Sequence, residues 1–381
     1  MISSLPNNSG LYVHIPFCRK KCIYCDFFCG GASIAKWDIF TENLIKELKS
    51  RAIEISPKLR TIYIGGGTPS LIPKNNLKLL VSAIYDTFDC SELKEFSFEV
   101  NPEDVNSENI KTWTNLGINR ISMGVQSLVD KELSFLNRNH SADCAYEATR
   151  ILCKSFPEVN VDIMFGIPGQ TLSSLEFSIS SLLSLHPTHF SAYSLMYEEG
   201  TPLTTLRDKG AFLEMDEEYN LSLYKLTSSI LDDNGFEHYE ISNYAQPGHR
   251  SIHNSSYWDF HPYLGVGPSA HSFDGISLRR GNFPDLKYYI SNHSSLFNPP
   301  HTEESLSAEE LHDEYIMLRL RTREGIDLSD FSSRFGKKKL DILISKAESF
   351  ISNSQLILSQ NNLSLSESGI MTSDNIILSL V

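Results

Sequence analysis

The chain has 381 residues and a formal net charge of −14 at pH 7. This acidic balance argues against a protein that binds nucleic acid, because basic runs such as residues 337–339 are short. No apolar run approaches the ~20 residues of a membrane span, and the first ten residues lack the basic and apolar segments of a signal peptide. We therefore expect a cytoplasmic protein.

The first half of the chain alternates short apolar runs with stretches of helical periodicity. We expect strands over residues 11–14, 61–64, 95–100, 120–124, 159–164 and 189–194, with helices over 36–51, 77–88, 108–116, 131–136, 142–153 and 173–185. Such alternation predicts a parallel sheet with right-handed crossovers, and six strands are too few for an eight-unit barrel. The predicted fold class is therefore α/β, with a partial (β/α)6 barrel over residues 1–205.

The character of the sequence changes after Gly200. We expect a helix over residues 216–233, an extended edge over 237–244, a His- and aromatic-rich stretch over 238–271 and a helix over 308–320. The Asn298-Pro299-Pro300 run is typical of a linker. The sequence thus predicts a connecting segment over residues 206–300 and a smaller C-terminal α/β domain over residues 301–381.

Four of the seven cysteines lie within twelve residues, directly after the first predicted strand. Cys18, Cys22 and Cys25 have the spacing C-x3-C-x2-C, and their soft thiolates suit an iron–sulfur cluster or zinc. Zinc sites usually add a second, separated pair of ligands, which this compact trio lacks. The spacing therefore favours a [4Fe–4S] cluster.

Most cubane clusters have four cysteine ligands. Three ligands leave one iron open, and S-adenosylmethionine (SAM) can chelate that iron through its amine and carboxylate groups. Cys29 would close this position if it bound the cluster, but its spacing from Cys25 favours a neighbouring role.

Special residues recur where predicted strands end, the edge at which an α/β barrel places its chemistry. The run from Gly65 to Pro69 lets backbone approach a ligand closely. Glu99, Gln126 and Asp162 are candidates to bind ribose hydroxyls or the methionine amine. Arg138 can hold a carboxylate through two N–H groups. Each of these residues, taken singly, is equally compatible with a structural role.

Several segments together resemble the oxygen-independent coproporphyrinogen III oxidase family of radical SAM proteins. These segments are residues 12–18, 65–69, 99–103, 124–127, 137–138 and 162–169, with 314–321 and 324–328 resembling the family's C-terminal domain. The resemblance implies a SAM site lined by Tyr12, Tyr24, Gly66, Gly67, Thr68, Glu99, Gln126, Arg138 and Asp162.

The family has an oxidase branch, which decarboxylates coproporphyrinogen III, and a heme-chaperone (HemW) branch, which binds heme and delivers it to target proteins. Three features favour the HemW branch. Phe27 stands where the oxidase has a further cysteine, and the cluster motif begins near the N-terminus, whereas the oxidase has a long preceding segment. Residues 253–258 read His-Asn-Ser-Ser-Tyr-Trp, similar to the branch's H-N-x-x-Y-W heme motif.

His253 is the candidate heme ligand, because imidazole is a common axial ligand of heme iron. Tyr257 and Trp258 offer flat apolar surface for a porphyrin. Nearby alternatives to His253 are His249, His261 and His271. The resemblance implies heme and heme-receiving proteins as partners, allows a homodimer, and favours a protein without coproporphyrinogen oxidase activity. The alternatives are the anaerobic oxidase itself and a radical SAM enzyme with another substrate.

Overall fold

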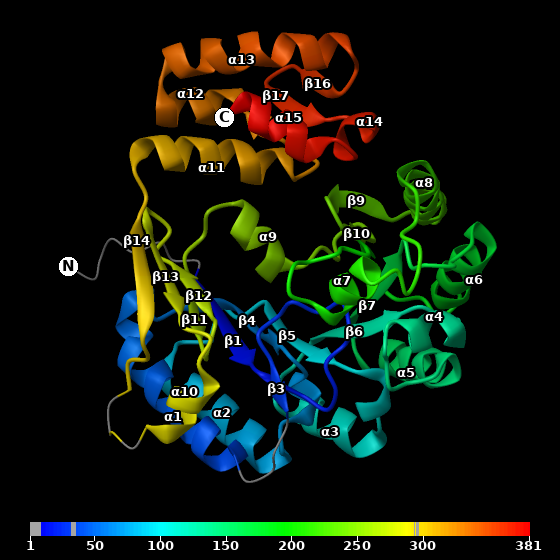
Figure 1. Cartoon of the computed structure of the whole chain (residues 1–381). Helices are drawn as coiled ribbons and strands as arrows, with labels where there is room; N and C mark the ends of the chain where they lie inside the picture. Colours follow the sequence, from blue (N-terminus) through cyan, green and yellow to red (C-terminus); the bar gives the residue numbers. More distant parts are fainter. Residues whose placement is uncertain (1–8, 32–35, 293, 295–296) are drawn as a thin grey trace.

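The computed structural model describes residues 9–31, 36–292, 294 and 297–381 (Figure 1). A single sheet of twelve strands runs through the larger part of the molecule in the order β14-β13-β12-β11-β1-β4-β5-β6-β7-β8-β10-β9. Its central strands are β1 (Ser9–Ile15), β4 (Leu59–Gly66), β5 (Glu95–Val100), β6 (Arg120–Gln126), β7 (Glu158–Phe165) and β8 (His189–Ser194). They are mutually parallel, as the sequence predicts.

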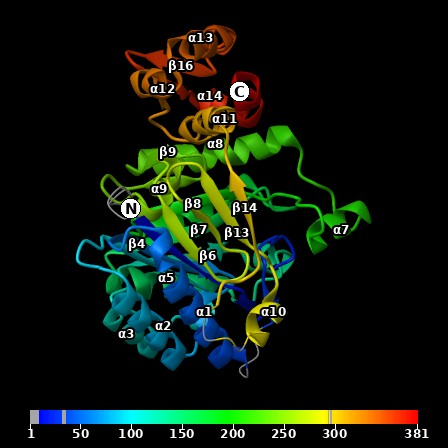
Figure 2. The ribbon, with the colours of Figure 1, turned by 90° about the vertical axis from the view of Figure 1, so that its left-hand side faces the viewer.

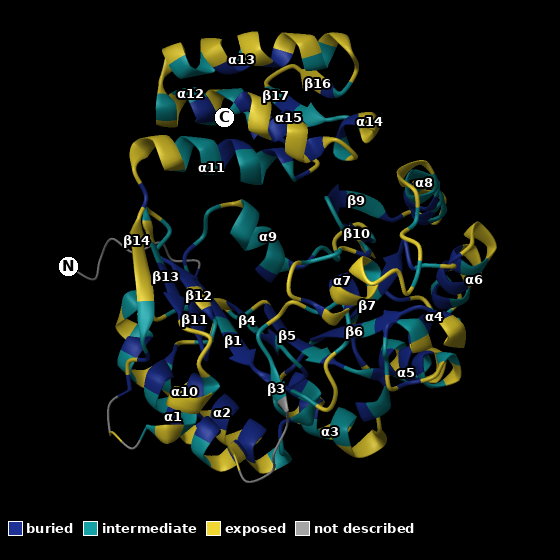
Figure 3. Ribbon diagram, in the orientation of Figure 1, coloured by how far each residue is buried: buried dark blue, intermediate teal, exposed yellow. Residues whose placement is uncertain are grey.

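Helices on the outer face cover these strands (Figures 1 and 3). They are α1 (Trp37–Arg51), α2 (Lys74–Thr87), α3 (Ser107–Asn115), α4 (Asp130–Phe135), α5 (Ala142–Ser155) and α6 (Leu172–Leu183), with short 3-10 turns η2 (Ala52–Glu54), η3 (Pro69–Leu71) and η4 (Pro102–Asp104). Strand side chains alternate between the two faces. In β1, Leu11, Val13 and Ile15 are buried in the core, which leaves Tyr12 and His14 for the inner face.

Residues 202–305 extend the same sheet at both ends, so its added strands include the first five residues of the predicted C-terminal domain. Beyond β8 come β10 (Asn243–Ala245) and β9 (Glu237–Glu240); beside β1 lie β11 (Tyr263–Val266), β12 (His271–Phe273), β13 (Leu278–Asn282) and β14 (His301–Ser305). β11 is parallel to β1, and β12 to β14 follow as antiparallel strands. The helices of this segment are α7 (Pro202–Asp208), α8 (Glu217–Asp233), α9 (Ile252–Trp258) and α10 (Leu286–Ser291). Residues 202–305 therefore build onto the barrel sheet.

The C-terminal residues form a smaller unit above the barrel (Figure 2). It contains α11 (Ala308–Leu320), α12 (Leu328–Phe335), α13 (Lys337–Ser352), α14 (Glu367–Ile370) and α15 (Ser373–Leu380) around a sheet of β15 (Ile326–Asp327), β17 (Asn362–Leu365) and β16 (Leu356–Ser359). This unit has its own core, which includes Ile316, Phe331 and Leu363. No helix among the described residues is long and apolar enough to cross a bilayer.

Candidate functional site

The cysteine loop begins at β2 (Phe17–Cys18), directly after β1. Phe17 is buried, and its ring packs against Trp37 and Phe40 with centroid distances of 4.4 and 5.0 Å, which fixes the start of the loop. Cys18, Cys22 and Cys25 are all half-buried, and the Cys25 amide donates to the Cys22 carbonyl at 3.3 Å.

Cys29 lies among the predicted ligands. The loop returns through β3 (Gly30–Gly31), which pairs in parallel with β2. This pairing brings the Cys29 thiol within hydrogen-bonding distance of the thiols of Cys18 and Cys25. Among the described residues, no three His, Cys, Asp or Glu side chains are grouped as ligands of a metal ion. The cluster assignment stays a prediction, with Cys29 as a neighbour of two of the three thiols.

The surroundings of the thiols fit a thiolate-held group. Arg138 Nη1 donates to Cys22 Sγ at 3.4 Å, and Thr68 Oγ1 donates to Cys18 Sγ at 3.6 Å. Hydrogen bonds to the charged form of a group favour that form. A Cβ atom at Gly67 would lie 3.0 Å from Cys18 Sγ and 2.7 Å from the Phe17 carbonyl oxygen, so this position requires glycine.

Arg138 connects the cysteine loop to the carboxyl ends of the strands. Besides Cys22, its guanidinium donates from Nη2 to Asn101 Oδ1 at 2.9 Å and to the Gly124 carbonyl at 2.6 Å. A Cβ atom at Gly124 would meet both Arg138 Nη2 and Gln126 Nε2 at 3.0 Å. Gly124 thus provides the space in which the two side chains meet, a role that its place in the motif alone does not reveal.

Glu99 lies next to the last residue of β5, whereas Asp162 lies within β7, three residues before its end. Glu99 accepts hydrogen bonds from Tyr63 Oη at 2.7 Å and from the Gly66 amide at 2.9 Å. Asp162 accepts from Asn160 Nδ2 at 2.7 Å. Burial raises the pKa of Glu99 to about 7 and that of Asp162 to about 6. A cationic amine bound here would favour the ionised form of both groups.

Gln126 gives an independent sign that this region takes a polar ligand. Its backbone has a φ of 68°, and its Oε1 is buried with no hydrogen-bond partner among the residues that the structure describes. Buried polar atoms without partners are rare in folded proteins and call for an explanation. An O–H or N–H group of a bound ligand would supply the missing donor, as the prediction of a ribose contact requires.

The two predicted tyrosines lie on different sides of the site. Tyr24 packs against an apolar cluster that contains Leu136 and Ile167. Tyr12 is hydrogen-bonded to His14 Nδ1 at 3.0 Å, and its ring lies 6.0 Å from that of Tyr63. Tyr63 was not predicted from the sequence. Its alternation with Thr61 and Gly65 along one strand face is the signal that could have placed it in the site.

Helix α9 carries the predicted heme motif and packs against β4 and β5. His253 is buried, with Nδ1 bonded to Thr61 Oγ1 at 2.8 Å and Nε2 bonded to Tyr257 Oη at 2.7 Å. Its ring stacks on Tyr63 at 5.1 Å. Burial lowers the pKa of His253 to about 4, so the imidazole is neutral. Both ring nitrogens are therefore engaged within the protein, and iron binding by His253 stays a prediction.

Glu95 holds α9 in place and was missed by sequence reasoning. Its buried carboxylate accepts hydrogen bonds from the Ile252 amide at 2.6 Å, the His253 amide at 3.2 Å and Ser251 Oγ at 3.2 Å. A carboxylate at a helix N-terminus satisfies free amides and is favoured by the helix dipole. The only sequence signal was an acidic residue at the start of a buried strand.

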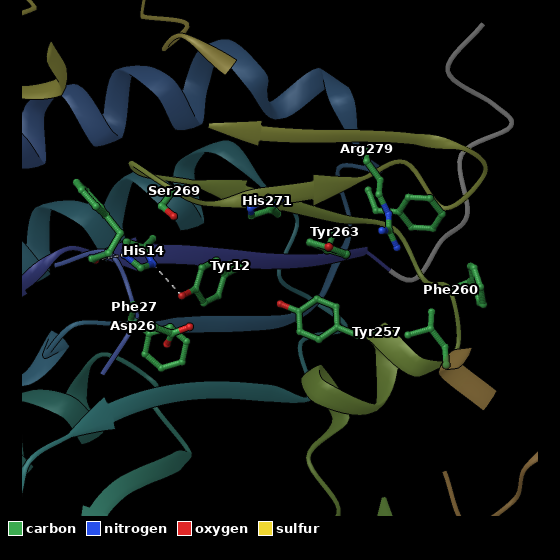
Figure 4. A pocket seen from close by; sticks show the side chains of 13 residues that line it. Tyr12, His14, Asp26, Phe27, Tyr257, Phe260, Tyr263, Ser269, His271 and Arg279 are labelled. Carbon is green, nitrogen blue, oxygen red and sulfur yellow. Dashed lines mark hydrogen bonds between the residues drawn. The ribbon is translucent and has the colours of Figure 1, made fainter. Parts of the chain in front are cut away.

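A cavity of about 530 Å³ lies between the inner sheet face, the cysteine loop and α11 (Figure 4). This volume is within the ~300–1,000 Å³ of small-molecule sites. It is lined by Tyr12, His14, Asp26, Phe27, Phe28, Tyr257, Phe260, Tyr263, Ser269, His271, Phe273, Arg279 and Leu318. Tyr257 of the predicted heme motif reaches this wall, whereas His253 and Trp258 are not among the lining residues.

Comparison with known proteins agrees with the sequence motifs. Residues 12–182 match the Radical SAM superfamily, and residues 306–372 match the HemN C-terminal domain. The heme chaperone HemW of Lactococcus lactis is 35% identical over 87% of this chain and 85% of its own length. HemW of Bacillus subtilis is 35% identical over 86% of each chain.

A relative from Danio rerio, "Radical S-adenosyl methionine domain-containing protein 1, mitochondrial", is 34% identical over 84% of this chain and 74% of its own. The solved structure of coproporphyrinogen III oxidase (HemN) from Escherichia coli superposes with a TM-score of 0.86, covering 100% of this chain and 91% of that chain. At 20% identity this match shows the fold, and it confirms the predicted radical SAM architecture. By sequence, the chain belongs to the HemW family of radical SAM proteins.

Proposed function

We propose that this protein is a heme chaperone: it binds heme in the cavity beside the cysteine loop and passes it to heme-receiving proteins in the cytoplasm. Its HemW relatives carry the name heme chaperone. The observation that carries the proposal is the cavity itself, which has an aromatic wall and an arginine, Arg279, with an unpaired N–H group. A porphyrin has a flat apolar ring and propionate groups that match these two features.

Cys18, Cys22 and Cys25 would hold a [4Fe–4S] cluster, and Gly66, Glu99, Gln126 and Asp162 would bind SAM. When bound, such a cluster with an open iron supplies the electron that cleaves SAM. The protein's own part is to keep donors near the sulfur atoms, from Arg138 and Thr68, and buried acceptors at the strand ends. These residues fit the groups they would hold.

A heme titration of the purified, reconstituted protein tests the proposal. We expect a Soret band that saturates at a fixed ratio of heme to protein, and transfer of that heme to an apo-hemoprotein. The same sample should fail to convert coproporphyrinogen. Absence of heme binding would refute the chaperone function, and efficient decarboxylation with SAM consumption would assign the oxidase function instead.

His253 is proposed as part of the heme site, and His253→Ala should weaken heme binding. The substitution removes the hydrogen bond that orients Tyr257 at the cavity wall. His261→Ala is the matched control, because His261 follows the same helix but lines a separate small cavity of about 80 Å³. Equal heme affinity of the two variants would remove α9 from the heme site.

A further inference from the structure

We propose that His271 on β12 is the axial ligand of the heme iron in the 530 Å³ cavity, and that Arg279 on β13 binds a propionate. The inference rests on the proposed heme function and deepens it. Under this assignment His253 positions Tyr257 and does not touch iron. The cavity lining places His271, Arg279 and Tyr257 around one space (Figure 4).

The strand register directs His271 and Arg279 to the same side of the sheet. His271 is paired with Gly281, and Phe273 with Arg279, in the antiparallel β12–β13 pair. Ser272, between them on β12, points the opposite way and accepts a hydrogen bond from Arg51 at 2.9 Å. Because side chains alternate along a strand, His271 and Phe273 both face the cavity, and Arg279 stands beside Phe273.

His271 has the free imidazole that iron binding requires. Two histidines line the cavity. His14 is buried, and its ring nitrogens are bonded to Tyr12 Oη and to the Phe28 carbonyl, both at 3.0 Å. His271 is exposed, and its ring makes no hydrogen bond among the described residues. A neutral imidazole nitrogen is a common ligand of heme iron, and of these two only His271 can offer one without breaking a bond.

Two glycines accommodate His271, Gly281 beside its imidazole and Gly265 beside its backbone. A Cβ atom at Gly281 would lie 2.9 Å from His271 Cε1, and one at Gly265 would lie 1.9 Å from the His271 carbonyl oxygen. Neither position can carry a side chain while His271 keeps its place. Gly281 thus lets the imidazole lie against β13 at the wall of the cavity.

The guanidinium group of Arg279 is held in place and has one N–H group available for a carboxylate. Its Nη1 and Nη2 bind the carboxylate of Glu314 on α11 at 2.7 and 2.8 Å, and its guanidinium lies 5.8 Å from the centre of the Phe273 ring. Its Nε is buried and has no partner in the described part of the chain. A buried donor without an acceptor is costly, and a propionate oxygen in the cavity would satisfy it. The ligand class is thus an iron porphyrin with free acid side chains.

Parallel titrations of the full-length protein with three probes test this assignment. Ferric heme tests the whole site, metal-free protoporphyrin IX omits the iron bond, and heme dimethyl ester omits the acid groups. The variants are His271→Ala, His253→Ala and Arg279→Leu, with His261→Ala as control. Affinities come from absorbance and fluorescence titrations, and the iron environment from the Soret position.

We expect His271→Ala to weaken heme at least about tenfold, since even second-shell changes at metal sites cost about 10- to 100-fold in affinity. Its affinity for protoporphyrin should stay within about twofold, and added imidazole should restore the wild-type Soret band. His253→Ala should weaken both porphyrins equally. Arg279→Leu should abolish the preference for heme over its dimethyl ester.

The opposite pattern overturns the inference. If His271→Ala binds heme with the wild-type affinity and Soret band, while His253→Ala loses heme and keeps protoporphyrin, then His253 is the ligand and the chaperone function stands. If the wild-type protein gives no Soret band, the proposed function fails and this inference fails with it.

Discussion

We predict that removal of the Glu95 side chain loosens α9, because this one carboxylate inside the barrel binds the start of that helix. In the structure its carboxylate takes hydrogen bonds from two amides and one hydroxyl at the start of α9, and a fourth from Ser97 Oγ at 2.8 Å. Glu95→Ala leaves the amides of the half-buried Ile252 and the buried His253 without an acceptor. The change should therefore loosen α9 specifically.

The magnitude follows from the two orphaned amides. Each buried polar group left without a partner costs about 1–3 kcal/mol, and the lost interaction with the helix N-terminus adds about 0.3–1 kcal/mol. We expect about 4 kcal/mol less free energy for the opening of α9. At about 1.4 kcal/mol per decade, its amides should exchange about a thousandfold faster, or as fast as in an unfolded segment.

Hydrogen exchange measured by mass spectrometry on peptides covering residues 252–258 checks this value. Glu92→Ala is the matched control, because Glu92 is exposed and pairs with Lys58 at the surface, where ion pairs contribute about 0–1 kcal/mol. A less than tenfold change in α9 exchange for Glu95→Ala, or an equal change for Glu92→Ala, would refute the capping role.

The remaining predictions concern the SAM side of the site. The pKa of Glu99 is raised from 4.5 to about 7 by burial, so Glu99 is neutral in both states below pH 4.5 and its ionisation above pH 7 costs the folded state about 3 kcal/mol. The free energy of unfolding of Glu99→Gln relative to wild type should therefore rise by that amount between pH 4.5 and 8. A difference between the two proteins in urea unfolding that stays the same at every pH would contradict this prediction. Gly67→Ala should displace Cys18 and lower the iron content after reconstitution, whereas unchanged iron would show that the loop adapts. Arg138→Lys cannot reach three acceptors at once and should weaken SAM binding at least about tenfold in equilibrium dialysis, while wild-type affinity would leave Arg138 a structural role.

Much of the barrel could be predicted from sequence because its strands are nearly continuous apolar runs between helical stretches. The place of Glu99 near the end of β5 followed from the same pattern. The strands after residue 260 could not be found in this way. Gly265 and Gly281 interrupt their alternation, and β11 pairs with β1 across some 250 residues of chain.

The surroundings of His253 were equally hidden from the sequence. One ring nitrogen is hydrogen-bonded to Tyr257 in the same helix, but the other is bonded to Thr61, 192 positions away, and the His253 amide is bonded to Glu95, 158 positions away. A motif names a residue type at a spacing, and it cannot tell whether the nitrogens are already occupied. Likewise, the sequence offered Arg138 as a carboxylate binder, whereas the structure shows its N–H groups shared among a sulfur and two oxygen atoms.

The cysteine loop also forms a wall of the large cavity, through Asp26, Phe27 and Phe28. These three residues directly follow Cys25, a predicted ligand, so binding of a metal centre by this cysteine also affects the shape of the pocket proposed for the porphyrin. Two ligands that contact one loop are coupled when either one changes the conformation of that loop, and the coupling is equal in both directions. Damage to the metal centre by oxygen would therefore change the amount of heme that the protein binds.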